Sequence, residues 1–141
     1  MVEAESGQLI EVSWEVCNKV GGIYTFLASK AEILVDLYKD KYILIGPYFP
    51  QKIASQFQEE LPNPDFKSVS DELKKEGIIC HFGRWLINGS PQVILIDFFN
   101  YMHNSDNIKK YLWDHFKIDS LNSPYDFNEP LVWSYCVGMF I

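Results

Sequence analysis

The stretch that decides the fold is residues 9–47, LIEVSWEVCNKVGGIYTFLASKAEILVDLYKDKYILIGP. Its first residues, Leu9–Trp14, are rich in β-branched and aromatic side chains and predict a strand. Gly21 and Gly22 then precede a run with helical periodicity, and an apolar strand follows at Lys41–Ile45. This order predicts two parallel strands joined by a crossover helix. We expect that helix to bury Phe26, Leu27, Ile33, Leu34, Leu37 and Tyr38.

The middle of the chain carries weaker signals. Three prolines between residues 50 and 65 predict a long loop with one short helix around Ile53–Glu60. Ser68 or Ser70 can cap a following helix, DELKKE, which ends near Gly77. The sequence IICHFGRW, residues 78–85, then predicts a strand.

Two more features complete the expected elements. Asn88-Gly89 predicts a hairpin turn that leads into an apolar strand over residues 93–98. Ser105 is expected to cap a helix with one apolar side, and Asn128 with Pro130 is expected to start the last helix.

These elements predict an α/β fold with a mainly parallel, Rossmann-like sheet flanked by helices. Val12, Leu44 and Ile94 should share the sheet, since their segments are apolar runs suited to burial on both faces. The length of 141 residues fits one domain, which we place at residues 9–141 after a flexible lead at residues 1–8.

Charge and composition exclude several classes of partner. A net charge of −7 argues against nucleic acid, and no apolar stretch is long enough to span a membrane. The acidic N-terminus lacks the features of a signal peptide, so we expect a cytoplasmic protein. Cys17, Cys80 and Cys136 are odd in number and lack CxxC spacing, which favours reduced thiols in the core.

The chemical candidate is the turn Asn18-Lys19-Val20-Gly21-Gly22. Free N–H groups at the start of a helix attract anions, two glycines permit close approach, and Lys19 adds a positive charge. The turn therefore suits a phosphate. A plain glycine turn with a solvated lysine is an equally good interpretation of these residues alone.

Other nucleotide motifs and metal sites are not supported. The dinucleotide fingerprint G-x-G-x-x-G and the P-loop motif are both missing from the sequence. His81 and Cys80 are neighbours on a strand and point to opposite faces, which makes a poor metal pair. Arg84 is expected to pair with a carboxylate or stack on Trp85 rather than bind a ligand.

Several separated segments carry a family resemblance: IEVSWEVCNKVGGIYTFLASKA, KYILIGP, GRWLINGSPQVILIDF and NEPLVWSYCVGMF. Together they resemble the N-terminal part of the eukaryotic-type glycogen synthases, which are retaining glycosyltransferases. The resemblance implies a GT-B architecture of two Rossmann-like domains, of which this chain holds most of the first. It also implies transfer of glucose from UDP-glucose to the non-reducing end of an α-1,4-glucan, in glycogen biosynthesis.

The resemblance further implies that Lys19 contacts the donor phosphates, with Gly21 and Gly22 shaping the loop beside them. No catalytic residue, metal or cofactor is expected within this chain. Because the chain stops at Ile141 inside an apolar run, we expect an inactive fragment that lacks the C-terminal domain of its parent enzyme. The same stop is expected to expose Trp133, Val137, Phe140 and Ile141.

Two matters stay open from the sequence. A homo-oligomer is neither favoured nor excluded. The alternative function is a non-catalytic Rossmann-like module that binds a carbohydrate or another protein.

Overall fold

The computed structural model describes residues 7–118 and 125–141, so most of the predicted lead at residues 1–8 lies outside the described residues. In chain order the elements of the first half are β1 (Leu9–Val12), α1 (Gly22–Tyr38), η1 (Lys39–Lys41), β2 (Tyr42–Pro47), β3 (Phe57–Glu59) and α2 (Pro64–Lys75). The second half contains β4 (Ile79–Trp85), β5 (Gln92–Asp97), η2 (Phe99–Asn104), α3 (Ser105–Phe116) and α4 (Tyr125–Phe140).

The five strands form one mixed sheet in the order β1-β2-β5-β4-β3. β1, β2 and β5 run parallel, whereas β4 and β3 are antiparallel to their neighbours. The prediction that Val12, Leu44 and Ile94 share a sheet is confirmed, because β2 pairs with both β1 and β5. The expectation of a mainly parallel sheet is only partly met, since β4 runs antiparallel to both of its neighbours, β5 and β3.

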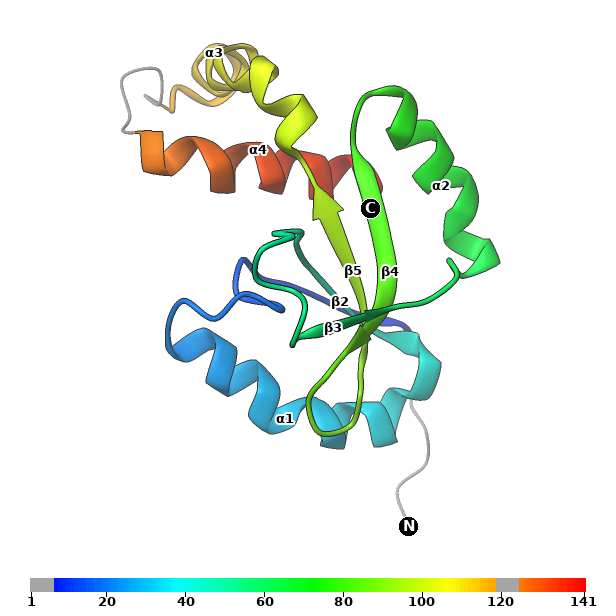
Figure 1. Ribbon diagram of the computed structural model, residues 1–141. Helices are drawn as coiled ribbons and strands as arrows, with labels where there is room; N and C mark the ends of the chain where they lie inside the picture. Colours follow the sequence, from blue (N-terminus) through cyan, green and yellow to red (C-terminus); the bar gives the residue numbers. More distant parts are fainter. Residues whose placement is uncertain (1–6, 119–124) are drawn as a thin grey trace.

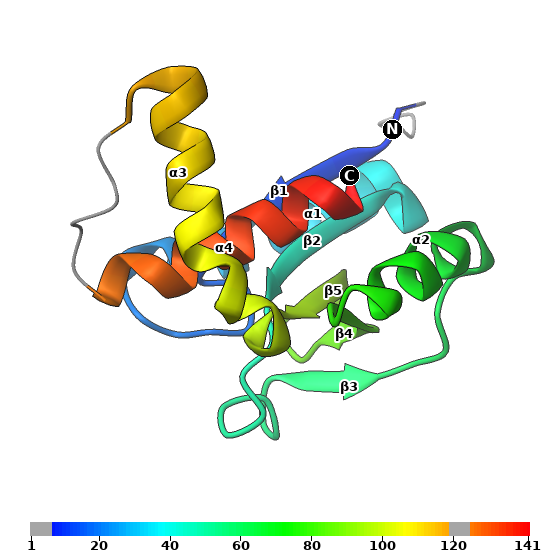
Figure 2. The same ribbon diagram turned by 90° about the horizontal axis from the view of Figure 1, so that it is seen from above.

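Helices cover both faces of this sheet, with α1 on one side and α2 and α4 on the other (Figures 1 and 2). Alternate residues of the central strands supply the two cores: Ile43 and Ile94 lie on the α2 and α4 side, while Leu44 and Val93 lie on the α1 side. A parallel strand buried on both faces is apolar throughout, which explains the continuous run in β2.

Helix α1 begins where the glycine pair predicted, but it buries a narrower face than expected. Leu27 and Ala31 are buried, whereas the side chains of Phe26 and Ile33 are 62% and 63% exposed. Leu34, Leu37 and Tyr38 are only half-buried. The predicted apolar face was therefore too wide.

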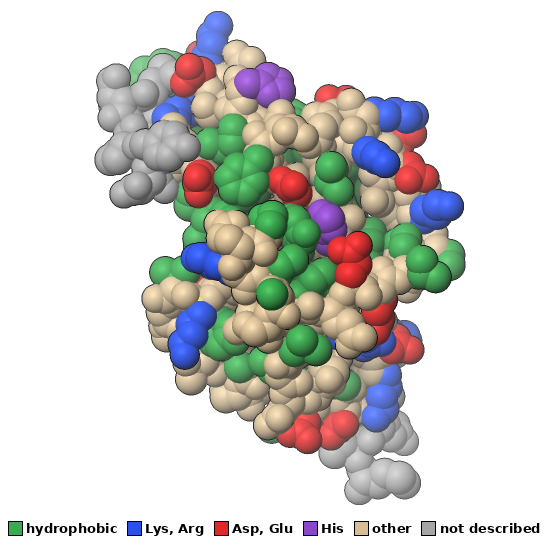
Figure 3. Space-filling view, viewed as in Figure 1, with side chains coloured by type: hydrophobic (Ala, Val, Ile, Leu, Met, Phe, Trp, Pro, Cys, Tyr) green, Lys and Arg blue, Asp and Glu red, His purple; other side chains and the backbone are tan. Residues whose placement is uncertain are grey.

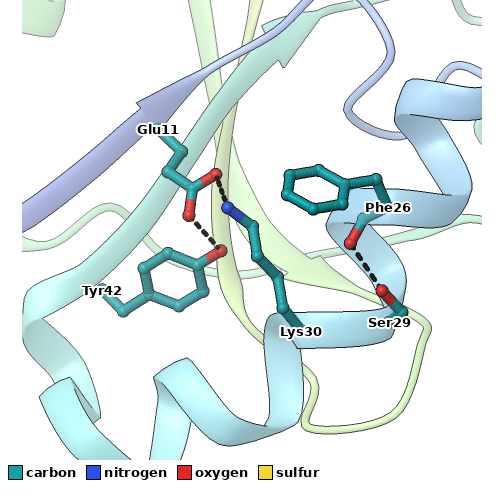
Figure 4. Close-up of polar contacts among 5 residues, drawn as sticks. All are labelled: Glu11, Phe26, Ser29, Lys30 and Tyr42. Carbon is teal, nitrogen blue, oxygen red and sulfur yellow. Dashed lines mark hydrogen bonds and ion pairs between the residues drawn. The ribbon is translucent and has the colours of Figure 1, made fainter.

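A polar contact fastens α1 to the edge strand (Figure 4). Lys30 Nζ lies 2.9 Å from Glu11 Oε2, and the Tyr42 hydroxyl donates to Glu11 Oε1 at 3.2 Å. Burial and the neighbouring carboxylate raise the pKa of Tyr42 above its usual value. Lys30 Nζ also lies over the exposed Phe26 ring, 4.7 Å from the ring centroid. The ring therefore makes a cation–π contact with Lys30.

Several predicted elements need correction. The prediction of a short helix around Ile53–Glu60 is wrong, because residues 57–59 form β3 and pair with β4. Gly83 permits this pairing, since a Cβ there would lie 2.1 Å from the Gln58 carbonyl oxygen. Tertiary pairing of a short edge strand thus outweighs local helical preference.

Helix boundaries differ from the predictions at three N-termini. α2 begins at Pro64, capped by Asn63, whose side chain accepts from the Asp65 N–H at 3.0 Å, so Ser68 and Ser70 lie inside it. Ser105 is the first residue of α3 and does not cap it. α4 begins at Tyr125, before the predicted Asn128 and Pro130.

The expected exposure at the end of α4 is also wrong for three of four residues. Trp133, Val137 and Phe140 are buried in the core on the α2 and α4 side, and only Ile141 is exposed. The helix lies across the sheet (Figure 2), and these side chains share a core with residues of β2 and β5. None of the helices in the described residues is long and apolar enough to cross a membrane.

Candidate functional site

The candidate turn lies at the carboxyl edge of the parallel strands. The loops that follow β1, β2 and β5 all leave this edge, because the three strands run in one direction. In open α/β sheets this is the edge where ligands bind. The turn that carries Lys19, Gly21 and Gly22 follows β1 and leads directly into α1.

An aromatic cluster fixes the base of the turn. Trp14, just after β1, packs edge-on against Phe49 after β2, with ring centroids 5.3 Å apart. It also contacts Phe98 after β5 and Trp133 of α4, at 5.9 and 5.4 Å. The three loops are therefore held together below the candidate site.

The turn also rests directly on strand β2. Val16 is fully buried, and a Cβ at Gly46 would lie 2.6 Å from the Val16 carbonyl oxygen. Only glycine at this position lets the loop approach β2 so closely. Cys17, the next residue, has φ 55°, and burial raises the pKa of its thiol well above the usual value.

The buried carboxyl group of Glu15 caps the N-terminus of α1. Its side chain is nearly buried, and Oε1 accepts hydrogen bonds from the N–H groups of Gly21, at 2.5 Å, and Tyr24, at 3.4 Å. The sequence predicted free N–H groups here, and the prediction is wrong for the N–H groups of Gly21 and Tyr24. A carboxylate at a helix N-terminus satisfies its amides as a capping side chain would.

Asn18 holds the exposed part of the turn in place. Its side chain is 1% exposed, and Nδ2 donates to the Trp14 carbonyl oxygen at 2.9 Å. Its Oδ1 accepts from Lys52 Nζ, in the loop after β2, at 3.0 Å. This bond ties the loops after β1 and β2 together on the surface.

A second tie runs through Gln56. Its Oε1 accepts from the Tyr24 hydroxyl at 2.5 Å and from Trp85 Nε1 at 3.3 Å. Its backbone oxygen lies 3.8 Å from Cys17 Sγ. The first turn of α1, the candidate loop and β4 thus share one anchoring residue.

Lys19, Gly21 and Gly22 are exposed on this framework. Lys19 Nζ lies 5.8 Å from the centroid of the Tyr24 ring, and it has no ion pair within residues 7–118 and 125–141. A Cβ at Gly22 would meet nothing within 4 Å, and at Gly21 only Glu15 Oε1 at 3.5 Å. The structure therefore brings the three predicted residues together on an accessible turn.

The other polar residues considered from the sequence have partners elsewhere. Arg84 Nε lies 3.4 Å from Glu60 Oε2, as expected for ion pairing. His81 stacks on Tyr48 and lies 3.0 Å from Glu59 Oε2. The three cysteines are free thiols, as predicted. On the face in Figure 3, Lys and Arg side chains alternate with Asp and Glu and form no continuous basic surface.

Sequence reasoning missed the roles of Glu15, Lys52 and Gln56. Glu15 lies six residues before Gly21, so an acid shortly before the glycine pair was an available signal. Lys52 and Gln56 contact the turn across more than thirty residues of chain, and no local pattern marks such contacts.

Comparison with known proteins decides the family. The family model described as glycogen synthase matches residues 11–141. The chain belongs to the glycogen synthase family. Glycogen [starch] synthase of Dictyostelium discoideum is 39% identical over 128 residues, covering 90% of this chain and 14% of that protein.

Other members of the glycogen synthase family show the same pattern. The liver glycogen [starch] synthase of Homo sapiens is 39% identical over 137 residues, which cover 94% of this chain and 19% of the human protein. The Neurospora crassa protein is 37% identical over 140 residues, or 99% of this chain and 20% of its own length. The chain thus spans a fifth or less of these relatives.

Proposed function

We propose that this chain supplies the donor-phosphate turn of a glycogen synthase. In this proposal the complete enzyme transfers glucose from UDP-glucose to the non-reducing end of an α-1,4-glucan, in the cytoplasm. Residues 9–141 would form part of the first of two Rossmann-like domains in a GT-B arrangement, with the remaining domain as their partner. Lys19, Gly21 and Gly22 contact or border the donor diphosphate.

The observation that carries this proposal is the bare surface of the glycine pair. Neither Gly21 nor Gly22 has a positive φ, and no crowded neighbour requires glycine at either position. Gly21 is the N-cap of α1, a position that glycine suits, but the fold of the described residues gives no reason for a second glycine at position 22. A ligand that lies against the backbone would give one.

The chemistry proposed for Lys19 is electrostatic. When the glycosidic bond to the donor breaks, negative charge develops on the departing diphosphate. A fixed ammonium group beside that charge stabilises the transition state more than the ground state. Lys19 lies on a turn held by Trp14, Glu15 and Asn18, so little reorganisation is needed at that moment.

The test uses a chimera in which this chain replaces the matching segment of the human liver enzyme. Initial rates with UDP-glucose and glycogen are measured for the chimera and its Lys19→Ala variant. We expect a loss of about a hundredfold, the usual effect of removing one well-placed group that stabilises transition-state charge. Thermal melting should change little, because exposed substitutions usually cost about 0.5 kcal/mol or less.

The matched control is Lys110→Ala, which removes an exposed lysine of α3 and changes the net charge equally. Its rate should equal that of the chimera. Equal rates for Lys19→Ala and the control would contradict the role of Lys19. A folded chimera without activity would contradict the proposed function and favour the non-catalytic binding module.

A further inference from the structure

We propose that Lys52 is a second phosphate-contacting residue of the donor site, acting beside Lys19. This inference rests on the proposed function and extends it to a residue in a different loop. Lys52 follows β2, and its Nζ lies 3.0 Å from Oδ1 of Asn18, the residue directly before Lys19. Lys52 Nζ thus contacts the residue that directly precedes Lys19 in the turn.

The position of Lys52 is set by buried neighbours. Asn18 is almost fully buried and is itself held by the Trp14 carbonyl oxygen, so its Oδ1 is a fixed acceptor. Lys52 Nζ also lies 5.4 Å from the centroid of the Phe49 ring, a member of the aromatic cluster below the turn. These contacts hold a flexible side chain over the turn and lower the entropy cost of binding with it.

Lys52 keeps the capacity to bind an anion. An ammonium group has three N–H donors, and Asn18 accepts from only one of them. Among the residues that the structure describes, no carboxylate lies within ion-pair distance of either Lys19 or Lys52. The Lys52 side chain is exposed, so a phosphate can reach it.

Glu15 weakens the attraction of the α1 N-terminus for an anion. Its carboxyl group already accepts from the N–H groups of Gly21 and Tyr24, which would otherwise face an incoming phosphate. It also places an acidic group below the turn of a chain whose net charge is −7. With part of the helix N-terminus occupied, side-chain cations must supply more of the attraction for a diphosphate.

The experiment titrates the chimera of this chain and the human liver enzyme with UDP and, separately, with inorganic pyrophosphate, and measures each affinity by calorimetry. The variants are Lys52→Gln, which keeps an N–H donor without the charge, and Lys52→Arg, which keeps the charge. We expect Lys52→Gln to weaken binding of both ligands about fivefold and Lys52→Arg to stay within about twofold of the unaltered chimera. Lys110→Ala is the matched charge control and should bind normally.

The salt dependence of binding shows whether Lys52 contacts a phosphate or has a purely structural role. Screening weakens exposed charge pairs, so the fivefold difference should shrink below about twofold between roughly 0.02 and 0.5 M salt. A difference that persists at high salt would mean that Lys52 only holds Asn18, and it would overturn the inference.

The outcomes also separate this inference from the proposed function. If Lys19→Ala weakens UDP binding and Lys52→Gln does not, Lys52 is no donor contact and the proposed function stands. If the unaltered chimera binds neither UDP nor pyrophosphate, the donor turn and the proposed function both fail. Loss on Lys52→Gln with full rescue by Lys52→Arg supports the second cation.

Discussion

At the scale of single residues, the structure requires glycine at different positions of this chain for different physical reasons. Gly77 and Gly89 adopt positive φ angles that other residues rarely adopt. Gly46 and Gly83 sit where a Cβ would overlap a neighbouring backbone. Gly22 has neither constraint, like Gly7 and Gly138, and the proposed function assigns glycine at position 22 to the bound donor.

Replacing Gly22 with alanine tests this distinction. Because Gly22 is the first residue of α1 and has open space around it, alanine should leave the free energy of unfolding unchanged or raise it by about 0.5 to 1 kcal/mol. The added methyl group would separate the backbone from the diphosphate, and UDP affinity should fall about tenfold. Denaturant unfolding and UDP titration of the same samples measure both effects.

The matched control for that variant is Gly138→Ala, a helical glycine in α4 that also has open space around it. It should gain the same stability without any change in UDP binding. If Gly22→Ala binds UDP as tightly as Gly138→Ala does, the bare surface at Gly22 does not face the donor.

Some residues of the candidate site could be predicted from the sequence, and others could not. Lys19, Gly21 and Gly22 were predictable because a strand, a glycine turn and a helix place them locally. The hydrogen bonds from Gly21 to Glu15 and from Lys52 to Asn18 were not, since both depend on how loops pack after folding. The donor role of these residues remains a prediction.

At the scale of elements, long periodic segments were predicted well and short ones poorly. α1 and β2 have strong patterns and lie where expected. β3 spans three residues and exists because β4 offers it a partner, which local propensity cannot indicate. The start of α2 was missed although Asn63-Pro64 is a recognisable helix start.

The contact between the candidate loop and β2 gives a prediction at this scale. In Gly46→Ala, the new Cβ would meet the Val16 carbonyl oxygen and side chain, and neither can move without shifting the loop. We expect a loss of about 1 to 3 kcal/mol in the free energy of unfolding, as for other overpacked cores. Chemical denaturation measures this loss.

Because the loop that moves carries the proposed donor turn, Gly46→Ala should also weaken UDP binding. Gly7→Ala is the control, because a Cβ there meets nothing within 4 Å. Stability equal to that of Gly7→Ala would show that the loop does not rest on β2 as described.

At the scale of the whole molecule, the sheet separates two cores and gathers three loops at one edge. Strand direction places the loops after β1, β2 and β5 together, and the aromatic cluster around Trp14 locks them. The α/β class was predictable because apolar strands alternate with helices. The mixed strand order was harder to predict, since hairpin signals do not say which edge the added strands will take.

Buried thiols give the last prediction, which concerns global stability. Cys80 and Cys136 both contact the core on the α2 and α4 side. Burial raises the pKa of each thiol from about 9 to about 12. In the unfolded chain these thiols lose their protons near pH 9, whereas in the folded chain they keep them. The unfolded state therefore binds fewer protons above pH 9, and the free energy of unfolding falls as pH rises toward 12.

Each thiol should contribute a slope of up to about 1.4 kcal/mol per pH unit in that range and almost none below about pH 8. Denaturant unfolding at several pH values between roughly 8 and 10.5, with a non-thiol reductant present, measures the slope. Cys136→Ala should be less stable at neutral pH because it leaves a small cavity, yet its stability should fall less steeply with pH. The loss of stability at neutral pH reports the packing of the Cys136 side chain, and the change in slope reports the ionisation of its thiol. An identical slope in Cys136→Ala would show that the Cys136 thiol does not ionise differently in the folded and unfolded chains.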